Sequence, residues 1–342
     1  MAKRKLSKHQ SRRIKQNQTA SIERANSTQD EQDETLLGEE QKGRVIAHYG
    51  SQVDVEFADS ASSERCHMRA NVEAIVTGDN VICRKGSEMA VVVSIEPRSN
   101  TLNRPDSYGN LKPVAANIDQ IIITIAPEPE AHFNLIDRYL VAAESQNLNS
   151  IILINKADLI DDERRNRFIK IRRLYSDLGY QLLEASVKQD HGLDELKACL
   201  LGKTSIFVGQ SGVGKSSIIK HLLPGHDIII GELSKHVVKG RHTTTHSRLY
   251  HFPEGGDCID SPGIREFGLW HLLPSQVIEG FVEFRDFAYQ CKFRDCSHEQ
   301  EPSCALKQAL REKKITAERF ESYKRIIATL DDVTVKSTQH QN

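Results

Sequence analysis

One octapeptide, Gly209–Ser216, constrains the fold of this chain more than any other feature. Its sequence, GQSGVGKS, matches the pattern G-x-x-x-x-G-K-[ST]. It directly follows the apolar run Ser205–Val208, and a helical pattern continues from it to Leu223. A strand, a glycine-rich turn and a helix in that order place backbone N–H groups and a helix N-terminus around a phosphate. The segment therefore predicts a phosphate-binding loop in an α/β domain.

The side chains of this loop are candidate nucleotide contacts. We expect Lys215 to reach the β- and γ-phosphates of a nucleotide and the Ser216 hydroxyl to bind Mg²⁺. The nucleotide-binding residues predicted in this segment are Gly209, Gln210, Ser211, Gly212, Val213, Gly214, Lys215, Ser216 and Ser217.

A second motif, Asn155-Lys156-Ala157-Asp158, follows another apolar run and bears on the choice of base. A carboxylate can accept both the N1–H and the exocyclic N–H of guanine, which adenine cannot match. We expect Asp158 to select GTP over ATP, Asn155 to brace the loop and the Lys156 stem to cover the base. Taken alone the motif could be an ordinary polar turn, but its place at a strand end favours a guanine site. Ser186, at the next strand end, is the predicted backbone contact to guanine O6.

Two later segments supply candidate contacts to Mg²⁺ and the γ-phosphate. Asp260–Gly263 (DSPG) has the D-x-x-G form, in which the Asp260 carboxylate holds Mg²⁺ through water and the Gly263 N–H meets the γ-phosphate. Between this segment and the phosphate-binding loop lies the threonine-rich stretch Gly240–Thr245. Among its threonines we expect Thr244 to bind Mg²⁺.

The candidate catalytic residue is a histidine. Many GTPases orient the attacking water with a glutamine just after D-x-x-G, but Ile264 stands there and an aliphatic side chain cannot orient water. His242, beside Thr244, is the nearest group that can. We hypothesise that His242 acts with Lys215 and Thr244; the alternative is that His242 is one of several exposed histidines in a basic loop.

The order of these motifs along the chain is unusual. In the common GTPase arrangement the guanine motif follows the phosphate-binding loop, whereas here Asn155 precedes Gly209 and Asp260 comes last. Compact domains with adjacent termini tolerate circular permutation, so the same sheet can still form. The segment after Asp260, which should respond to loss of the γ-phosphate, then becomes the tether to the C-terminal part of the chain.

Three of the seven cysteines cluster with a histidine near the C-terminus, in the pattern Cys291-x4-Cys296-x-His298-x5-Cys304. Three thiolates and an imidazole suit a closed tetrahedral Zn²⁺ site, and with an odd number of cysteines zinc is favoured over disulfides. Such an ion would be structural, because no coordination position stays open. The spacing is not that of a zinc finger, so a coincidental cluster remains the alternative.

The regions outside these motifs predict an arm, a barrel and an α/β sheet. Residues 1–42 read as a disordered arm, basic up to residue 20, which is either a solubilising tail or a segment that lies on RNA phosphate. Five short β-type runs in residues 43–100 indicate a small barrel, for which an oligonucleotide-binding (OB) fold is favoured over an SH3-like barrel. After a polar connector, Arg98–Pro113, strands and helices alternate as in a mostly parallel sheet.

Charge and hydropathy bear on partners and location. Lys plus Arg total 46 against 47 Asp plus Glu, and this net charge of −1 at first argues against a nucleic-acid partner. Positive charge is nevertheless concentrated in residues 1–20 and 233–253, so we expect salt-dependent RNA binding. No apolar run is long enough to span a membrane and no signal peptide is apparent, which predicts a cytoplasmic protein with no membrane partner.

Together these motifs resemble those of the circularly permuted ribosome small-subunit-dependent GTPases, and the resemblance spans residues 43 to about 330. It implies a circularly permuted α/β P-loop GTPase domain (101–269), preceded by an all-β OB-fold barrel and followed by a small helical zinc-binding domain (270–342). It also implies a GTP hydrolase that binds GTP/GDP, Mg²⁺ and one structural Zn²⁺. That family's catalytic histidine maps onto His242 and its metal-binding threonine onto Thr244.

The resemblance further implies a function in ribosome assembly. We expect the protein to bind the small (30S) ribosomal subunit and its rRNA late in maturation, with turnover stimulated by the subunit, and to be monomeric off the ribosome. The alternative is a nucleotide-regulated RNA-binding scaffold in which GTP is mainly structural. A P-loop kinase is disfavoured, because no acceptor-substrate domain is visible.

Overall fold

The computed structural model describes residues 38–58, 62–69, 72, 74–86, 89–105, 110–224, 247–261 and 272–339. The chain forms two compact units, Met1–Ile75 with Asn80–Pro97 and Val76–Asp79 with Arg98–Asn342. Residues 1–37 of the predicted arm lie outside the described residues. The bounds of the arm and of the three expected domains remain predictions.

The first unit is a closed five-stranded barrel. Its strands are β1 (Glu40–Tyr49), β2 (Gln52–Phe57), β3 (Ser63–Met68), β4 (Asn80–Arg84) and β5 (Ala90–Ile95). β1 pairs with both β2 and β4, and β3 pairs in parallel with β5, so the order around the barrel is β1-β2-β3-β5-β4. This topology is OB-like, which confirms the favoured alternative over an SH3-like barrel.

β1 can pair with both β2 and β4 because it bends. Its register against β2 shifts between Val45 and Ala47, as in a β-bulge, which increases the local twist. Gly43 lies so close to β2 that a Cβ there would be 2.4 Å from Cγ1 of Val55. Val45, Val53 and Val55 fill the barrel core. A side chain at position 43 would therefore push β2 away from the strand that closes the barrel.

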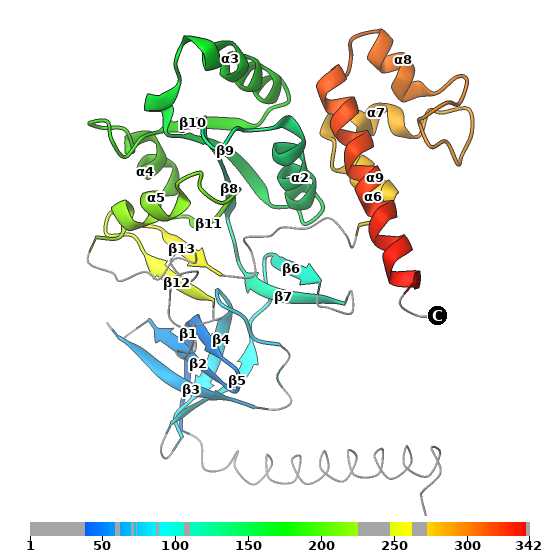
Figure 1. The fold of residues 1–342 in the computed structure, drawn as a ribbon. Coiled ribbons are helices and arrows are strands. Elements are labelled where there is room, and N and C mark those ends of the chain that lie inside the picture. The colour runs from blue at the N-terminus through cyan, green and yellow to red at the C-terminus, as the bar shows by residue number, and fades with distance from the viewer. Residues whose placement is uncertain are drawn as a thin grey trace, which may run out of the picture. The chain divides into compact units, whose positions relative to one another are not determined.

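The second unit contains a six-stranded sheet (Figure 1). Its strands are β8 (Gln120–Ile125), β9 (Asn149–Asn155), β10 (Gln181–Ala185), β11 (Thr204–Val208), β12 (Arg248–His251) and β13 (Asp257–Asp260). Their order is β10-β9-β8-β11-β13-β12, and every neighbouring pair is parallel except β12 with β13. All residues of β8 and β11 are buried, as expected for central parallel strands. The predicted mostly parallel sheet is confirmed.

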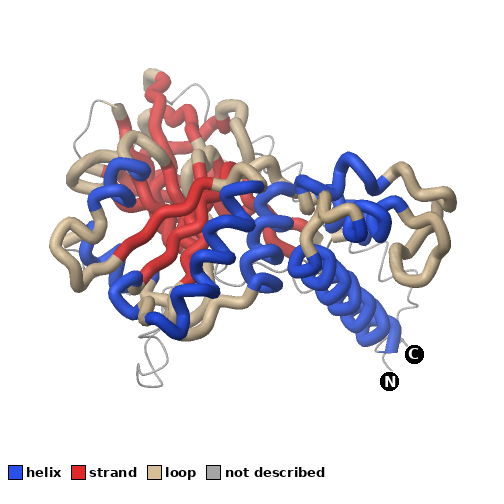
Figure 2. The backbone as a smooth tube through the Cα atoms, turned by 90° about the horizontal axis from the view of Figure 1, so that it is seen from above, coloured by secondary structure: helices blue, strands red, loops and turns tan. Residues whose placement is uncertain are grey.

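Helices cover both faces of this sheet (Figure 2). They are α2 (Phe133–Glu144), α3 (Asp162–Asp177), α4 (Asp194–Leu200) and α5 (Lys215–Leu222). α4 and α5 share an apolar core with the sheet residues Ile122, Leu153 and Phe207, while α2 packs on β8 and β9 and α3 packs on β10. Asp161 caps α3 by accepting the N–H of Arg164 at 3.0 Å.

The predicted polar connector is wrong over part of its length, because it forms a β-hairpin. β6 (Thr101–Pro105) pairs antiparallel with β7 (Leu111–Ala116). Leu102, Ala115 and Ala116 are fully buried. The hairpin is hard to recognise in the sequence, since polar residues flank Leu102 in β6 and each strand contains a proline, Pro105 and Pro113.

The C-terminal part of the second unit is helical, as predicted. Its elements are α6 (Pro274–Glu279), the 3₁₀ turn η5 (Val282–Phe284), α7 (Arg285–Ala288), α8 (Ala305–Arg311) and α9 (Ala317–Gln339). The helical pattern of the sequence predicts a last helix from about Ala317 to Leu330, and α9 instead continues to Gln339. Residues of α6, α8 and α9 share one apolar core with Val141 and Ala142 of α2. Within the described residues, no helix is both long and apolar enough to cross a membrane.

Candidate functional site

The phosphate-binding loop joins the carboxyl end of β11 to the first turn of α5. Gly209, Gly212 and Gly214 have φ angles of 141°, 86° and 92°, which side chains other than hydrogen rarely tolerate. A Cβ on Gly209 would lie 2.2 Å from the backbone O of Thr124. The loop can therefore follow this path only with glycine at these positions, and Gly214 is the residue that precedes the first turn of α5.

Lys215 reaches back over the loop. Its Nζ donates to the backbone O of Gly209 at 2.7 Å and of Gln210 at 2.8 Å. Ser216 is half-buried in the first turn of α5. The ammonium group thus lies within the curl of the backbone, where it can compensate the negative charge of a phosphate. The position of Lys215 fits a contact to a nucleotide β-phosphate, and the position of Ser216 fits a hydroxyl ligand of Mg²⁺.

The predicted guanine motif follows β9 and is held directly against the phosphate-binding loop. Asn155 is buried and its Nδ2 donates to the backbone O of Val213 at 2.8 Å. Lys156 has a left-handed backbone, with φ of 55°, and its Nζ donates at 2.7 Å to the backbone O of Gly212. The side chains of Asn155 and Lys156 therefore join the guanine motif to the phosphate-binding loop, although the two segments are far apart in the sequence.

Asp158 and Ser186 also meet. The hydroxyl of Ser186 donates to Oδ1 of Asp158 at 2.6 Å and accepts from the N–H of Lys188 at 3.2 Å. Ser186 is buried, and the side chain of Asp158 is 19% exposed. The sequence predicts a backbone contact from Ser186 and does not indicate the role of its hydroxyl, which orients the carboxylate. A serine opposite an aspartate at neighbouring strand ends could have indicated this contact.

The segment between β8 and α2, which carries no recognisable motif, also contacts the guanine motif and the phosphate-binding loop. Lys156 Nζ donates to the backbone O of Glu128 at 2.7 Å. A Cβ on Gly212 would lie 3.4 Å from Cδ of Pro129. The carboxyl end of every parallel strand reaches the same edge of the sheet, and that topology is the only signal that could have identified this segment.

Lys215, Ser216 and Asp260 of the predicted Mg²⁺ and catalytic set lie among the described residues. Asp260 ends β13 beside β11, so it lies at the same edge as the phosphate-binding loop. Ser261 is buried. Gly263, His242 and Thr244 lie outside the described residues. The described donors, the Ser216 hydroxyl and the Asp260 carboxylate, are oxygen ligands of the kind Mg²⁺ takes.

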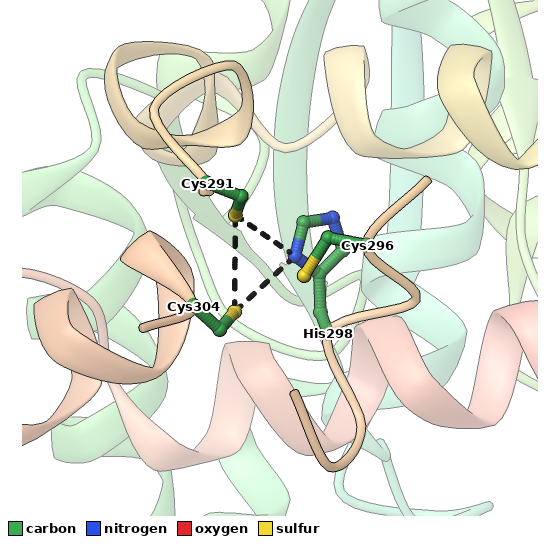
Figure 3. A group of neighbouring side chains, drawn as sticks. All are labelled: Cys291, Cys296, His298 and Cys304. Carbon is green, nitrogen blue, oxygen red and sulfur yellow. Dashed lines mark hydrogen bonds between the residues drawn. The ribbon is translucent and has the colours of Figure 1, made fainter. Parts of the chain in front are cut away.

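The four predicted zinc ligands converge (Figure 3). The candidate ligand atoms of Cys291, Cys296, His298 and Cys304 all lie within 4.8 Å of one another. His298 Nδ1 is 3.5 Å from Sγ of Cys291 and 3.4 Å from Sγ of Cys304, and these two sulfurs are 3.9 Å apart. Zn–S bonds of about 2.3 Å in a tetrahedron separate the sulfurs by roughly 3.8 Å. The side chains are therefore already arranged as a tetrahedral ion requires.

The environment of Cys296 disfavours a bare thiolate. Burial and the neighbouring thiols raise the pKa of Cys296 to about 12. Burial lowers the pKa of His298, which favours the neutral imidazole that metals bind. A dication would compensate the negative charge of the thiolates, so the donor set fits Zn²⁺.

Comparisons with known proteins agree with this geometry. The family model described as "RsgA GTPase" matches residues 95–270. The small ribosomal subunit biogenesis GTPase RsgA of Saccharophagus degradans is 52% identical over 345 residues, covering 98% of this chain and 100% of that protein. The protein of the same name from Pseudomonas aeruginosa is 51% identical over 337 residues, covering 97% of this chain and 99% of the relative.

Two solved structures share the architecture. YjeQ from Thermotoga maritima superposes with a TM-score of 0.70 at 32% identity, covering 85% of this chain and 99% of that chain. YloQ, a circularly permuted GTPase, superposes with a TM-score of 0.67 at 27% identity, covering 86% of this chain and 96% of that chain. The fold is therefore shared with these proteins, one of which is described as circularly permuted.

Proposed function

This chain belongs to the RsgA GTPase family and is a P-loop GTP hydrolase, and from that premise we propose that it binds the small ribosomal subunit and its rRNA late in the subunit's maturation. The observation that carries the guanine-nucleotide part of this function is the joining of the guanine motif to the phosphate-binding loop by Asn155 and Lys156. Relatives named for small-subunit biogenesis match nearly the whole chain, which supports the same role here.

In the proposed site, Asp158 reads guanine while its carboxylate is oriented by Ser186. Lys215 and the N–H groups of the phosphate-binding loop hold the phosphates. Ser216, Thr244 and Asp260 would hold Mg²⁺, which compensates the charge that develops on the phosphates. Gly263 would meet the γ-phosphate, and His242 would position the attacking water.

Cys291, Cys296, His298 and Cys304 would hold one structural Zn²⁺. The observation supporting this assignment is the mutual approach of the four ligand atoms within 4.8 Å. The ion would fix the loop between α7 and α8, which contains little other regular structure. It would take no part in hydrolysis, because all of its positions are filled by protein atoms.

The barrel is the proposed rRNA-binding part of the first unit. Arg65 and His67 lie on β3 with exposed side chains, and the Arg65 guanidinium stacks over the Tyr49 ring at 4.1 Å from the centroid. Guanidinium and aromatic planes are the groups on which unpaired bases stack, and OB barrels commonly bind nucleic acid through the strands that include β3. The basic residues 1–20 would add phosphate contacts. We further propose a cytoplasmic protein that is monomeric off the ribosome.

Multiple-turnover GTP hydrolysis with and without purified small subunits tests this function. We expect low intrinsic turnover, because hydrolysis depends on positioning, and marked stimulation by the subunit. Absence of stimulation would favour the scaffold in which GTP is mainly structural. His242→Ala should lower kcat and leave GDP affinity intact.

Nucleotide selectivity tests the base motif separately. Asp158→Asn should reduce the preference for GTP over ATP, because an amide cannot accept both guanine N–H groups. The matched control is Asp161→Asn, which changes an aspartate three positions away that caps α3 instead. Retained selectivity in Asp158→Asn would refute the assignment of this residue.

A further inference from the structure

Arg319 forms a buried ion cluster where the C-terminal helices meet the α/β sheet domain. Its side chain is fully buried, as is that of Asp137 on α2, and Glu283 of η5 is 12% exposed. The guanidinium donates to Asp137 Oδ1 at 2.6 Å and to the two Glu283 oxygens at 2.7 and 2.9 Å. The Tyr175 hydroxyl of α3 donates to the same Asp137 oxygen at 2.6 Å. One cation thus connects α9, α2, α3 and η5.

Packing around this cluster is continuous from α9 to α2. Val141 and Ala142 of α2 belong to the apolar core of the C-terminal helices. The ring of Phe281 in that core lies 4.3 Å from the guanidinium carbon of Arg319. At the start of α2, Asn134 Nδ2 donates to the backbone O of Ser322 at 3.2 Å. α2 is therefore held against α9 (Figure 1).

α2 is connected to the nucleotide site through the segment that precedes it. Residues 126–132 join β8 to α2, and within them Glu128 accepts from Lys156 Nζ at 2.7 Å. The same Nζ donates to Gly212 of the phosphate-binding loop, and Pro129 lies against that glycine. Any shift of α2 would thus move the segment that supports both Gly212 and Lys156.

A buried ion cluster is a costly way to gain stability alone. Apolar residues of similar volume often stabilise such a site as well or better, whereas removing one partner leaves a buried charge unpaired. What the cluster does provide is a defined position, because the fork of Arg319 satisfies Asp137 and Glu283 together only in one arrangement of α2, η5 and α9.

We propose that Arg319 is a positioning residue for the guanine-nucleotide site: it clamps α2 to the C-terminal helices and so holds residues 126–132 against Gly212 and Lys156. The C-terminal helices thereby regulate nucleotide affinity through packing as well as through the chain connection after Asp260. This inference rests on the proposed guanine-nucleotide site.

The test measures binding of N-methylanthraniloyl-GDP to the full chain. Arg319→Lys keeps the positive charge but cannot form the forked contact with both carboxylates. We expect its affinity for the GDP analogue to fall at least about fivefold, the lower end of typical coupling between sites. Circular dichroism at the assay temperature establishes that the variant is folded.

Glu318→Gln is the matched control. It lies one position earlier on α9 and removes an exposed ion pair with Lys170 of α3, leaving the Arg319 cluster intact. Its affinity for the GDP analogue should equal that of the wild type. A double-mutant cycle with Pro129→Ala adds a readout that a purely structural role would not move. Because Arg319 acts through this segment, the two effects should be less than additive.

Folded Arg319→Lys with wild-type affinity, or strictly additive effects in the cycle, would overturn the proposal. If the Arg319 variant does not fold, hydrogen exchange of the wild type decides, because coupling is reciprocal. GDP should then slow exchange in residues 317–324 more than in α8, and equal responses would overturn the proposal. A wild-type chain that fails to bind the GDP analogue would instead refute the proposed function.

Discussion

Replacing Gly214 with alanine should damage the nucleotide site in two separable ways. Gly214 has a φ of +92°, and a Cβ there would lie 2.4 Å from Nδ2 of Asn155. The left-handed backbone costs an alanine roughly 1–2 kcal/mol. The contact also displaces the Asn155 amide from the backbone O of Val213, and leaving these buried groups unpaired costs about 1–3 kcal/mol. The expected loss in unfolding free energy is therefore about 2–5 kcal/mol.

Gly179→Ala separates the two contributions. Gly179 has a nearly identical φ of +89°, but nothing lies within 4 Å of a Cβ built there. The Gly179→Ala variant should lose only the roughly 1–2 kcal/mol of unfolding free energy that the left-handed backbone costs, and its GDP affinity should stay unchanged. Urea unfolding and titration with a fluorescent GDP analogue measure both quantities in both variants. Equal losses of stability, with GDP affinity retained in Gly214→Ala, would refute the argument that Asn155 braces the loop.

Three further predictions concern the base, the metal and the arm. Ser186→Ala should weaken GDP binding about tenfold, because its hydroxyl donates to the charged Asp158 and such a hydrogen bond is worth about 1.5–3 kcal/mol. The control Ser150→Ala removes a buried hydroxyl that has no hydrogen-bond partner and should leave GDP binding unchanged. Cys304→Ser should lower both the zinc content, measured by elemental analysis, and the Tm, measured by calorimetry. The control Cys199→Ser changes a cysteine outside the cluster and should leave the zinc content unchanged. Deleting residues 1–20 should reduce the slope of log affinity for small subunits against log salt, and an unchanged slope would remove the arm from the interface.

The sequence predicts two strands of the α/β sheet at their observed bounds. The run Gln120–Ile125 predicts β8, which is buried along its whole length, and the run Gln181–Ala185 predicts β10, which is partly exposed but bounded by turn residues. Strands exposed on one side are less distinct. The β-type run Cys66–Ala70 predicts a strand, but β3 begins three residues earlier, at Ser63, because its first residues are exposed. In the β6–β7 hairpin the few buried side chains do not outweigh their polar neighbours, so the pattern indicates a loop.

The candidate site was predictable where its residues form local motifs and not where they meet through the fold. The phosphate-binding loop, the guanine motif and the cysteine cluster each lie within a short segment. Residues 126–132 have no motif, since their contact with Gly212 depends on β8 lying beside β11. The Arg319 cluster depends on helices nearly 200 residues apart in the chain meeting side by side; Asp137 and Arg319 are separated by 182 positions.

Circular permutation gives the C-terminal helices two connections to the nucleotide site. One is covalent, because the chain passes from Asp260 at the nucleotide edge of the sheet into these helices. The other is the packing of α9 on α2, whose preceding segment supports Gly212. A force on these helices from a bound partner would therefore act on opposite sides of the phosphate-binding loop, through β13 and through β8, which flank β11. This arrangement would let binding of a large partner change nucleotide affinity without any contact between that partner and the nucleotide.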